Sequence, residues 1–127
     1  MVIHEGKSYL SVEFAKKREK DLVFDPKDLQ GYKIPIGKDN YNNTIVWDLE
    51  NHSTPHALIC GATGSGKSVC VKSIVEYAKV AGIKNIVILD PKYEFMSYAN
   101  NAGVAVLNEI SAIEEGMKQL VAYMEDL

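Results

Sequence analysis

Eight consecutive residues have the types and spacing of a phosphate-binding loop. They are Gly61, Ala62, Thr63, Gly64, Ser65, Gly66, Lys67 and Ser68. Glycine lets the backbone turn tightly, so that successive N–H groups can point into one concave nest for phosphate oxygens. The lysine of such a loop reaches the β- and γ-phosphates, and the hydroxyl that follows it binds Mg²⁺. The sequence therefore predicts a site for a nucleoside triphosphate with Mg²⁺, in which Lys67 holds phosphate, Ser68 holds the metal and Val69 completes the nucleotide-binding set.

Two predicted elements would position this loop. The short apolar run over residues 56–60 is typical of a buried parallel strand, and it leads directly into the loop. A helix is expected from Lys67 to about Ala81, ended by Gly82. Its buried face would consist of Cys70, Ile74, Tyr77, Ala78 and Ala81. With a second buried strand over 85–89, these elements predict a right-handed βαβ unit and an α/β fold of the P-loop NTPase type.

The residues before this unit predict a β-hairpin. Two β-rich runs, 33–37 and 44–48, flank a polar turn, and Pro35 confines the first run to an edge strand. We interpret residues 33–127 as the nucleotide-binding domain and residues 1–32 as an N-terminal segment whose structure the sequence does not determine. The charged run over 16–21 is either a solvated face or a DNA contact.

Three further elements are expected after the second buried strand. They are a short helix over 93–99, a strand over 104–107 and a C-terminal helix. Ser111 and Glu114 have the spacing of a capping box, which would begin the last helix. The apolar residues on one face of that helix would be Ile113, Met117, Leu120, Val121 and Met124.

Hydrolysis of a nucleotide requires acidic residues that the sequence does not clearly supply. Phosphoryl transfer needs a carboxylate at a strand end for Mg²⁺ and a group that orients water. No Asp-Glu pair occurs, and Asp90, which follows four apolar residues, is the one candidate for the metal carboxylate. Glu94 and Glu109 could polarise a water, although a solvated or capping role suits each better. The guanine-reading pattern Asn-Lys-x-Asp is also absent, which favours ATP over GTP.

Composition restricts the class of protein. A length of 127 residues with 46% apolar composition fits one compact domain. With 14 basic and 17 acidic residues the net charge is −3, so a DNA contact would have to be local or lie in another chain. Cys60 and Cys70 lack zinc-site spacing and are expected to be reduced and mostly buried, as in a cytoplasmic protein. Neither a signal peptide nor a transmembrane segment is predicted.

Four stretches of the sequence resemble one family closely. They cover residues 34–39, 46–49, 55–70 and 89–92, and together they resemble the motor domain of FtsK/SpoIIIE-type DNA translocases. The likeness extends over residues 33–127 and is almost residue by residue over 55–70. Pro55-His56 and Asp90-Pro91-Lys92 make it specific, because phosphate binding alone does not require them.

This resemblance implies a RecA-like α/β motor, with a parallel sheet flanked by helices. Such motors assemble into rings, often hexamers, and move double-stranded chromosomal, plasmid or mobile-element DNA with ATP and Mg²⁺. In the family the Asp-Pro-Lys strand is distinct from the later strand that carries the Asp-Glu pair. The resemblance therefore argues against Asp90 as the metal ligand. It implies the front half of a motor domain, and we expect negligible ATPase activity from this chain alone.

Other readings of the same residues stay open. Conjugative coupling proteins and the ATPases of type VII secretion share the sequence motif around the loop. The secretion ATPases have a protein substrate in place of DNA. The continuation Val69-Cys70-Val71 favours the DNA translocases. A nucleotide-binding interaction module without turnover and a small-molecule kinase are the remaining alternatives.

Overall fold

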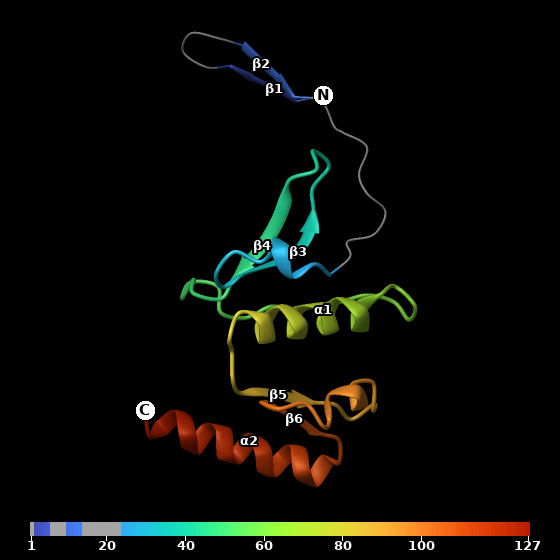
Figure 1. The fold of residues 1–127 in the computed structure, drawn as a ribbon, viewed down its shortest axis with the longest axis vertical. Helices are drawn as coiled ribbons and strands as arrows, with labels where there is room; N and C mark the ends of the chain where they lie inside the picture. The colour runs from blue at the N-terminus through green and yellow to red at the C-terminus, as the bar shows by residue number, and fades with distance from the viewer. Residues whose placement is uncertain (1, 6–9, 14–23) are drawn as a thin grey trace. The chain divides into compact units, whose positions relative to one another are not determined.

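The computed structural model in Figure 1 describes residues 2–5, 10–13 and 24–127. The length of the chain predicted one compact domain, but the structure has two compact units, Met1–Ala81 and Gly82–Leu127. Strands β1 (Val2–Glu5) and β2 (Leu10–Glu13) of the first unit pair antiparallel. The 3₁₀ turn η1 (Pro26–Asp28) lies before the predicted hairpin. The charged run over 16–21 lies outside the described residues.

The predicted hairpin is confirmed. Strand β3 (Lys33–Lys38) pairs antiparallel with β4 (Thr44–Asp48), and the register shifts between Pro35 and Gly37. This shift is a β-bulge at Ile36, while Pro35 stays opposite Val46. Asp39 closes the connecting turn, because its carboxylate accepts hydrogen bonds from the N–H groups of Tyr41 at 2.9 Å and Asn43 at 2.8 Å. The bond from the Asn43 N–H is the main cause that lowers the pKa of Asp39.

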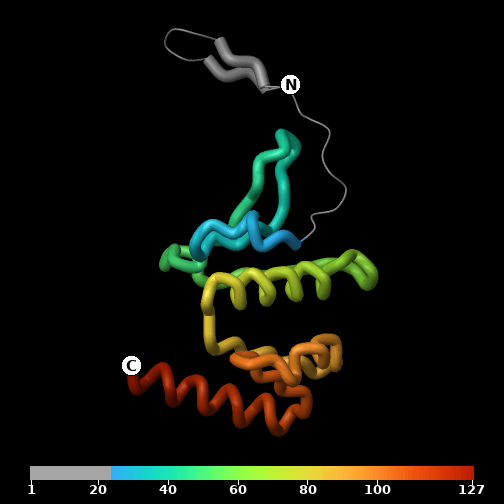
Figure 2. The backbone as a smooth tube through the Cα atoms, viewed as in Figure 1, coloured from blue at the N-terminus to red at the C-terminus, as the bar shows by residue number. Residues whose placement is uncertain are grey.

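Helix α1 (Lys67–Val80) forms the core of the first unit together with β3 (Figures 1 and 2). Ile34 and Tyr77 are fully buried. The Tyr77 hydroxyl accepts a hydrogen bond from the Asp25 N–H at 3.1 Å, and the Tyr77 ring lies 4.6 Å from the ring of Phe24. The helix runs almost as predicted and ends before Gly82, whose φ of 91° suits the glycine after a helix end. Residues 24–25 are therefore anchored on the same helix that follows the loop.

The strand predicted over residues 56–60 is not formed. The structure assigns no strand there, and the Leu58 side chain is 89% exposed. A strand exists through its ladder of hydrogen bonds, and among the described residues no sheet includes this run. Cys60 is consequently exposed and Cys70 half-buried, so the expectation of two mostly buried cysteines is wrong for Cys60. Both cysteines are free.

The second unit contains a parallel strand pair. Strand β5 (Ile86–Leu89) pairs with β6 (Val104–Leu107), so both strands formed where the apolar runs predicted them. Gly103, at φ 78°, lets the chain enter β6, because a Cβ there would lie 2.5 Å from the Lys84 carbonyl oxygen. The connection contains only the 3₁₀ turn η2 (Met96–Tyr98) in place of the helix expected over 93–99. Tyr93 has a φ of 59°, which no right-handed helix accommodates.

Helix α2 (Ile110–Glu125) ends the chain and contacts β6. Gly116 permits this approach, because a Cβ at that position would collide with the Leu107 side chain. The predicted capping box is wrong: Glu109 is the N-cap residue, without a side-chain cap bond, and Ser111 lies inside the helix. Shortly before the helix, the Asn108 side-chain amide donates to the Asp90 carbonyl at 2.9 Å, which joins the start of α2 to the end of β5. The apolar face of α2 is mostly exposed, at Met117, Leu120, Val121 and Met124.

Candidate phosphate-binding site

The glycine loop adopts a tight turn ahead of α1. The Ser65 N–H donates to the Ala62 carbonyl at 3.0 Å, which closes the turn. Gly64 and Gly66 have φ values of 80° and 90°, in the left-handed region that an L side chain rarely occupies. The two glycines therefore reverse the chain in the way that the sequence predicted, and they do so within residues that are exposed to solvent.

The first glycine of the loop has a different role. A Cβ on Gly61 would collide with the Ser65 side chain, so the Ser65 hydroxymethyl group folds back over the start of the loop. Only glycine fits this close approach without moving Ser65. The three glycines thus act through two backbone conformations and one close packing contact.

The last residues of the loop form the N-terminus of α1, which is the positive end of the helix dipole. Gly66 is the N-cap of α1 and makes no side-chain cap bond, and the first turn contains no acidic residue. The first backbone bond of the helix runs from the Cys70 N–H to the Gly66 carbonyl at 2.9 Å, so the earlier N–H groups of this turn point out of the helix. Together with the helix dipole they favour an anion at this end. Lys67 is exposed and Ser68 half-buried, both in this first turn.

The groups around this turn fit a nucleotide better than they fit a metal alone. Among the described residues, no group of three His, Cys, Asp or Glu side chains could hold a metal ion. Mg²⁺ at nucleotide sites keeps most of its shell as water and phosphate oxygens, with one or two protein oxygens. The Ser68 hydroxyl is such an oxygen in the first turn of α1. An anion held by the loop and a metal held mainly by that anion are therefore compatible with these residues.

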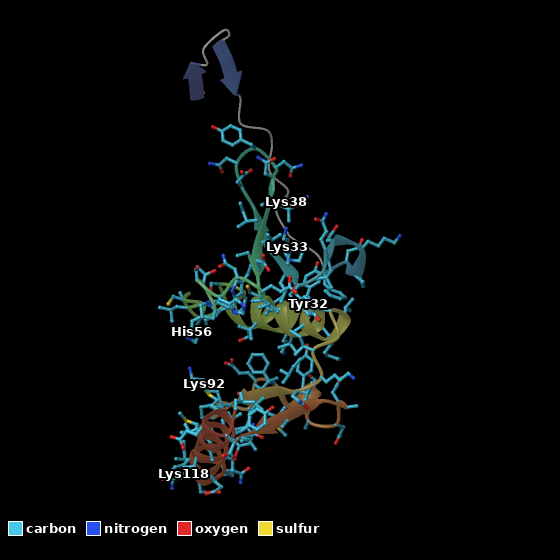
Figure 3. The ribbon with its side chains drawn as sticks, turned by 90° about the vertical axis from the view of Figure 1, so that its left-hand side faces the viewer. Tyr32, Lys33, Lys38, His56, Lys92 and Lys118 are labelled. Carbon is cyan, nitrogen blue, oxygen red and sulfur yellow. The ribbon has the colours of Figure 1, made fainter. Side chains whose placement is uncertain are left out.

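The carboxylate of Asp90, the candidate metal ligand, is hydrogen-bonded within the turn after β5. It is only 4% exposed, and its carboxylate accepts from the N–H groups of Glu94 at 3.0 Å and Phe95 at 2.9 Å. The Asn108 side-chain amide adds a third bond to the same carboxylate at 3.3 Å. These bonds fix the turn that carries Lys92, which is labelled in Figure 3. The Asp90 carboxylate therefore has the hydrogen-bonding geometry of a structural group within the second unit.

Tyr93 and Glu109 form a contact that the sequence patterns did not indicate. The Tyr93 hydroxyl donates a short hydrogen bond to the Glu109 carboxylate, across 16 residues of chain. This bond is the main cause that raises the pKa of Tyr93, since it stabilises the protonated phenol. Glu109, considered above as a group that polarises water, is engaged in this bond beside the Asp90 turn. The pairing depends on β5 and β6 lying side by side, which no local spacing reveals.

A comparison with known families decides the class of the chain. The sequence model of the FtsK/SpoIIIE family matches residues 24–127. The chain belongs to the FtsK/SpoIIIE family. The match begins at Phe24, the residue whose ring packs on Tyr77, so the structural anchor and the start of the match coincide. The resemblance inferred from the loop and from Asp90-Pro91-Lys92 is confirmed.

Individual relatives support the same family. The DNA translocase FtsK of Borreliella burgdorferi is 30% identical over 125 residues, which cover 91% of this chain and 16% of the relative. That of Clostridium acetobutylicum is 40% identical over 107 residues, or 75% of this chain and 14% of the relative. The DNA translocase SftA of Bacillus subtilis is 33% identical over 96 residues, or 71% and 10%. This FtsK/SpoIIIE-family chain thus spans less than a fifth of each relative.

No solved structure is significantly similar to the chain. Within the described residues, no helix is both long enough and apolar enough to cross a membrane. The fold is that of an α/β fragment of the family, with a β-hairpin and a parallel strand pair.

Proposed function

We propose that this chain binds ATP with Mg²⁺ as the phosphate-gripping part of a DNA-translocating ATPase. The observation that carries the proposal is the glycine loop leading into an uncapped helix end without acidic residues. Such an end attracts an anion through the helix dipole and through N–H groups that point outward. The membership of the chain in the FtsK/SpoIIIE family supports a nucleotide as this anion.

Each residue of the loop has a distinct part in this proposal. Lys67 places its ammonium group on the β- and γ-phosphates, and Ser68 offers its hydroxyl to Mg²⁺. The backbone N–H groups of 61–68 surround the phosphate oxygens, with Val69 beyond them. When bound, ATP supplies the phosphoryl group whose transfer drives movement. The described residues offer no Asp-Glu pair for that step, and Asp90 has a structural place, so we expect the chain alone to bind rather than to turn over.

DNA is the proposed cargo of the whole protein. The relatives reported above carry the name DNA translocase, which supports double-stranded DNA over a secreted protein. Since this chain has a net charge of −3 and spans 16% of the Borreliella relative, we assign DNA contact and ring assembly, as a hexamer, to the full-length motor. We further propose that the motor acts in the cytoplasm.

Calorimetric titration of the chain with ATP and Mg²⁺ tests the proposal. Lys67→Ala should weaken binding at least about a hundredfold, equivalent to about 2.7 kcal/mol, because it removes the cation on the phosphates. Lys79→Ala is the matched control, since Lys79 lies near the other end of α1, where it pairs with Glu76 at 3.5 Å. The control should change affinity less than about twofold, within the range of a surface ion pair.

Two results would contradict the proposal. One is the absence of ATP binding by the unaltered chain, and the other is an equal affinity of the Lys67→Ala variant. The expectation of binding without turnover is tested by phosphate release. A rate near 1 s⁻¹, at the low end of ordinary enzymes, would show that the chain holds its own catalytic groups.

A further inference from the structure

A cavity of about 160 Å³ lies in the first unit, between β3 and the first two turns of α1. It begins at Gly66, the last glycine of the loop. Its walls are Pro35, Ile36, Val69, Cys70, Ser73 and Ile74. The four helical residues among them are spaced as one stripe of α1, so a single face of the helix meets a single stretch of strand.

The bulge in β3 makes the strand side of this cavity. In a regular strand successive side chains point to opposite faces, so Pro35 and Ile36 could not both face α1. The register shift between Pro35 and Gly37 breaks that alternation, and both residues line the cavity. Bulges next to sites commonly re-aim a side chain in this way. Ile36 is thereby left partly exposed at the cavity, although it belongs to the strand that packs on α1.

The chemistry of the walls and the volume indicate a small, weakly polar occupant. No charged side chain lines the cavity, which therefore does not suit phosphate, and its polar side chains are the Ser73 hydroxyl and the Cys70 thiol. Sites for whole drug-sized ligands are about 300–1,000 Å³. A cavity of about 160 Å³ is smaller, and it fits one ring system of a larger ligand.

The position of the cavity matches the layout of a nucleotide. Gly66 belongs to both the loop and the cavity, and the cavity residue Val69 directly follows the loop, so the two sites are continuous. Ser73 lies six residues beyond Lys67 on α1. At 1.5 Å per residue this is about 9 Å along the helix, a distance that a sugar and an α-phosphate can bridge.

We propose that this cavity receives the base of the nucleotide whose phosphates the loop holds. Ile36 and Val69 contact the ring through apolar atoms, and the Ser73 hydroxyl offers its one hydrogen-bonding group. Apolar walls discriminate poorly between ligands that differ in polar substituents. The cavity therefore selects a base by its size more than by the hydrogen-bonding groups on its edge. The inference rests on the proposed function, because it concerns the same ligand.

A comparison of ATP with tripolyphosphate, which has no base, tests the inference by calorimetry in the presence of Mg²⁺. Ser73→Phe places a ring in the cavity and should weaken ATP binding about tenfold or more, while tripolyphosphate affinity changes less than about twofold. Ile36→Thr keeps the β-branched shape, removes apolar contact and should weaken ATP binding about threefold. Val80→Phe is the control, because Val80 is half exposed near the end of α1 and should alter neither ligand.

Alkylation of Cys70 gives a second readout. Cys60 is exposed and would react as well, so the measurement uses a Cys60→Ala background. ATP should slow the reaction of iodoacetamide with Cys70 about fivefold or more at saturation, because the base covers the cavity wall, whereas tripolyphosphate should leave the rate unchanged.

The outcomes separate the two proposals. If the unaltered chain binds both ligands and Ser73→Phe weakens neither or both equally, the base lies elsewhere and the inference is overturned while phosphate binding stands. Equal protection of Cys70 by both ligands would overturn it as well. If the unaltered chain binds neither ATP nor tripolyphosphate, the proposed function itself fails.

Discussion

The loop over residues 61–68 and the turn over residues 90–95 use the same backbone groups in opposite ways. In the turn after β5, the N–H groups of Glu94 and Phe95 converge on the carboxylate of Asp90 at 3.0 and 2.9 Å. In the glycine loop, no side chain caps Gly66 and the first turn of α1 contains no acid. One turn carries its own anion, and the other has none.

This difference separates a structural turn from a binding site. Converging N–H groups at a helix end or in a nest stabilise negative charge whatever its source. Where the chain supplies a buried carboxylate, the turn is complete in itself and fixes the path from β5 to η2. Where it supplies glycines and an exposed Lys67, the negative charge has to come from outside. The presence or absence of one acidic side chain decides which of the two a turn becomes.

The largest expected effect comes from giving the loop an anion of its own. Ser65→Asp places a carboxylate directly before Gly66, where its charge opposes that of phosphate. ATP affinity should fall at least about a hundredfold, or about 2.7 kcal/mol. The free energy of unfolding should rise by up to about 0.5 kcal/mol, because an acid near a helix N-terminus is favourable. Calorimetry and urea unfolding measure the two quantities.

Ser65→Asn is the matched control for this change, since it has nearly the same shape without the charge. It should retain most of the ATP affinity. Equal losses in the Asp and Asn variants would mean that shape, rather than charge, makes the loop a binding site, and the contrast between the two turns would then fail.

Removing the internal anion from the second turn should have the next largest effect. Asp90→Ala removes the acceptor of the part-buried N–H groups of Glu94 and Phe95, and the free energy of unfolding should fall by about 2 kcal/mol. Asp90→Asn keeps one acceptor oxygen and should cost about half as much. Urea denaturation measures both. A neutral result for Asp90→Ala would show that the carboxylate does not hold the turn.

The smallest effect concerns Tyr93, at the edge of the same turn. Its hydrogen bond to Glu109 raises the pKa of the phenol above 10.0. The protonated form is therefore favoured in the folded state, and this contribution is complete below pH 10 and is lost as the pH rises through the raised folded-state pKa. Unfolding free energies between pH 9 and 11 should decline less steeply in Tyr93→Phe than in the unaltered chain. Tyr123→Phe, on the exposed face of α2, is the control and should keep the original slope.

The elements that depend on local pattern were predicted well. The helix after the loop, the hairpin and strands β5 and β6 all lie where periodicity, turn residues and Gly82 indicated. The strand over 56–60 was wrong, because an apolar run becomes a strand only where a neighbour completes its ladder. The helix over 93–99 was wrong because Tyr93 has a φ of 59°, which a right-handed helix does not accommodate, and only the turn η2 forms there.

The loop was predictable because its function resides in contiguous residues. Three glycines, a lysine and a serine at fixed spacing specify the turn and predict its chemistry, and only local backbone geometry is needed to form the turn. The cavity behind the loop was not predictable, because it requires a bulge in β3 to face a stripe of α1 that lies some thirty residues further along. The Tyr93–Glu109 bond likewise requires β5 and β6 to be adjacent.

The sequence by itself determined the phosphate loop, the helix behind it and the family, since each depends on residues close together in the chain. Only the tertiary structure decided that the Asp90 carboxylate accepts hydrogen bonds within its own turn and that Ile36 and Ser73 line one cavity. The physical reason is the same in both cases. A hydrogen bond or a cavity wall between distant residues depends on how the elements pack, and spacing along the chain does not record it.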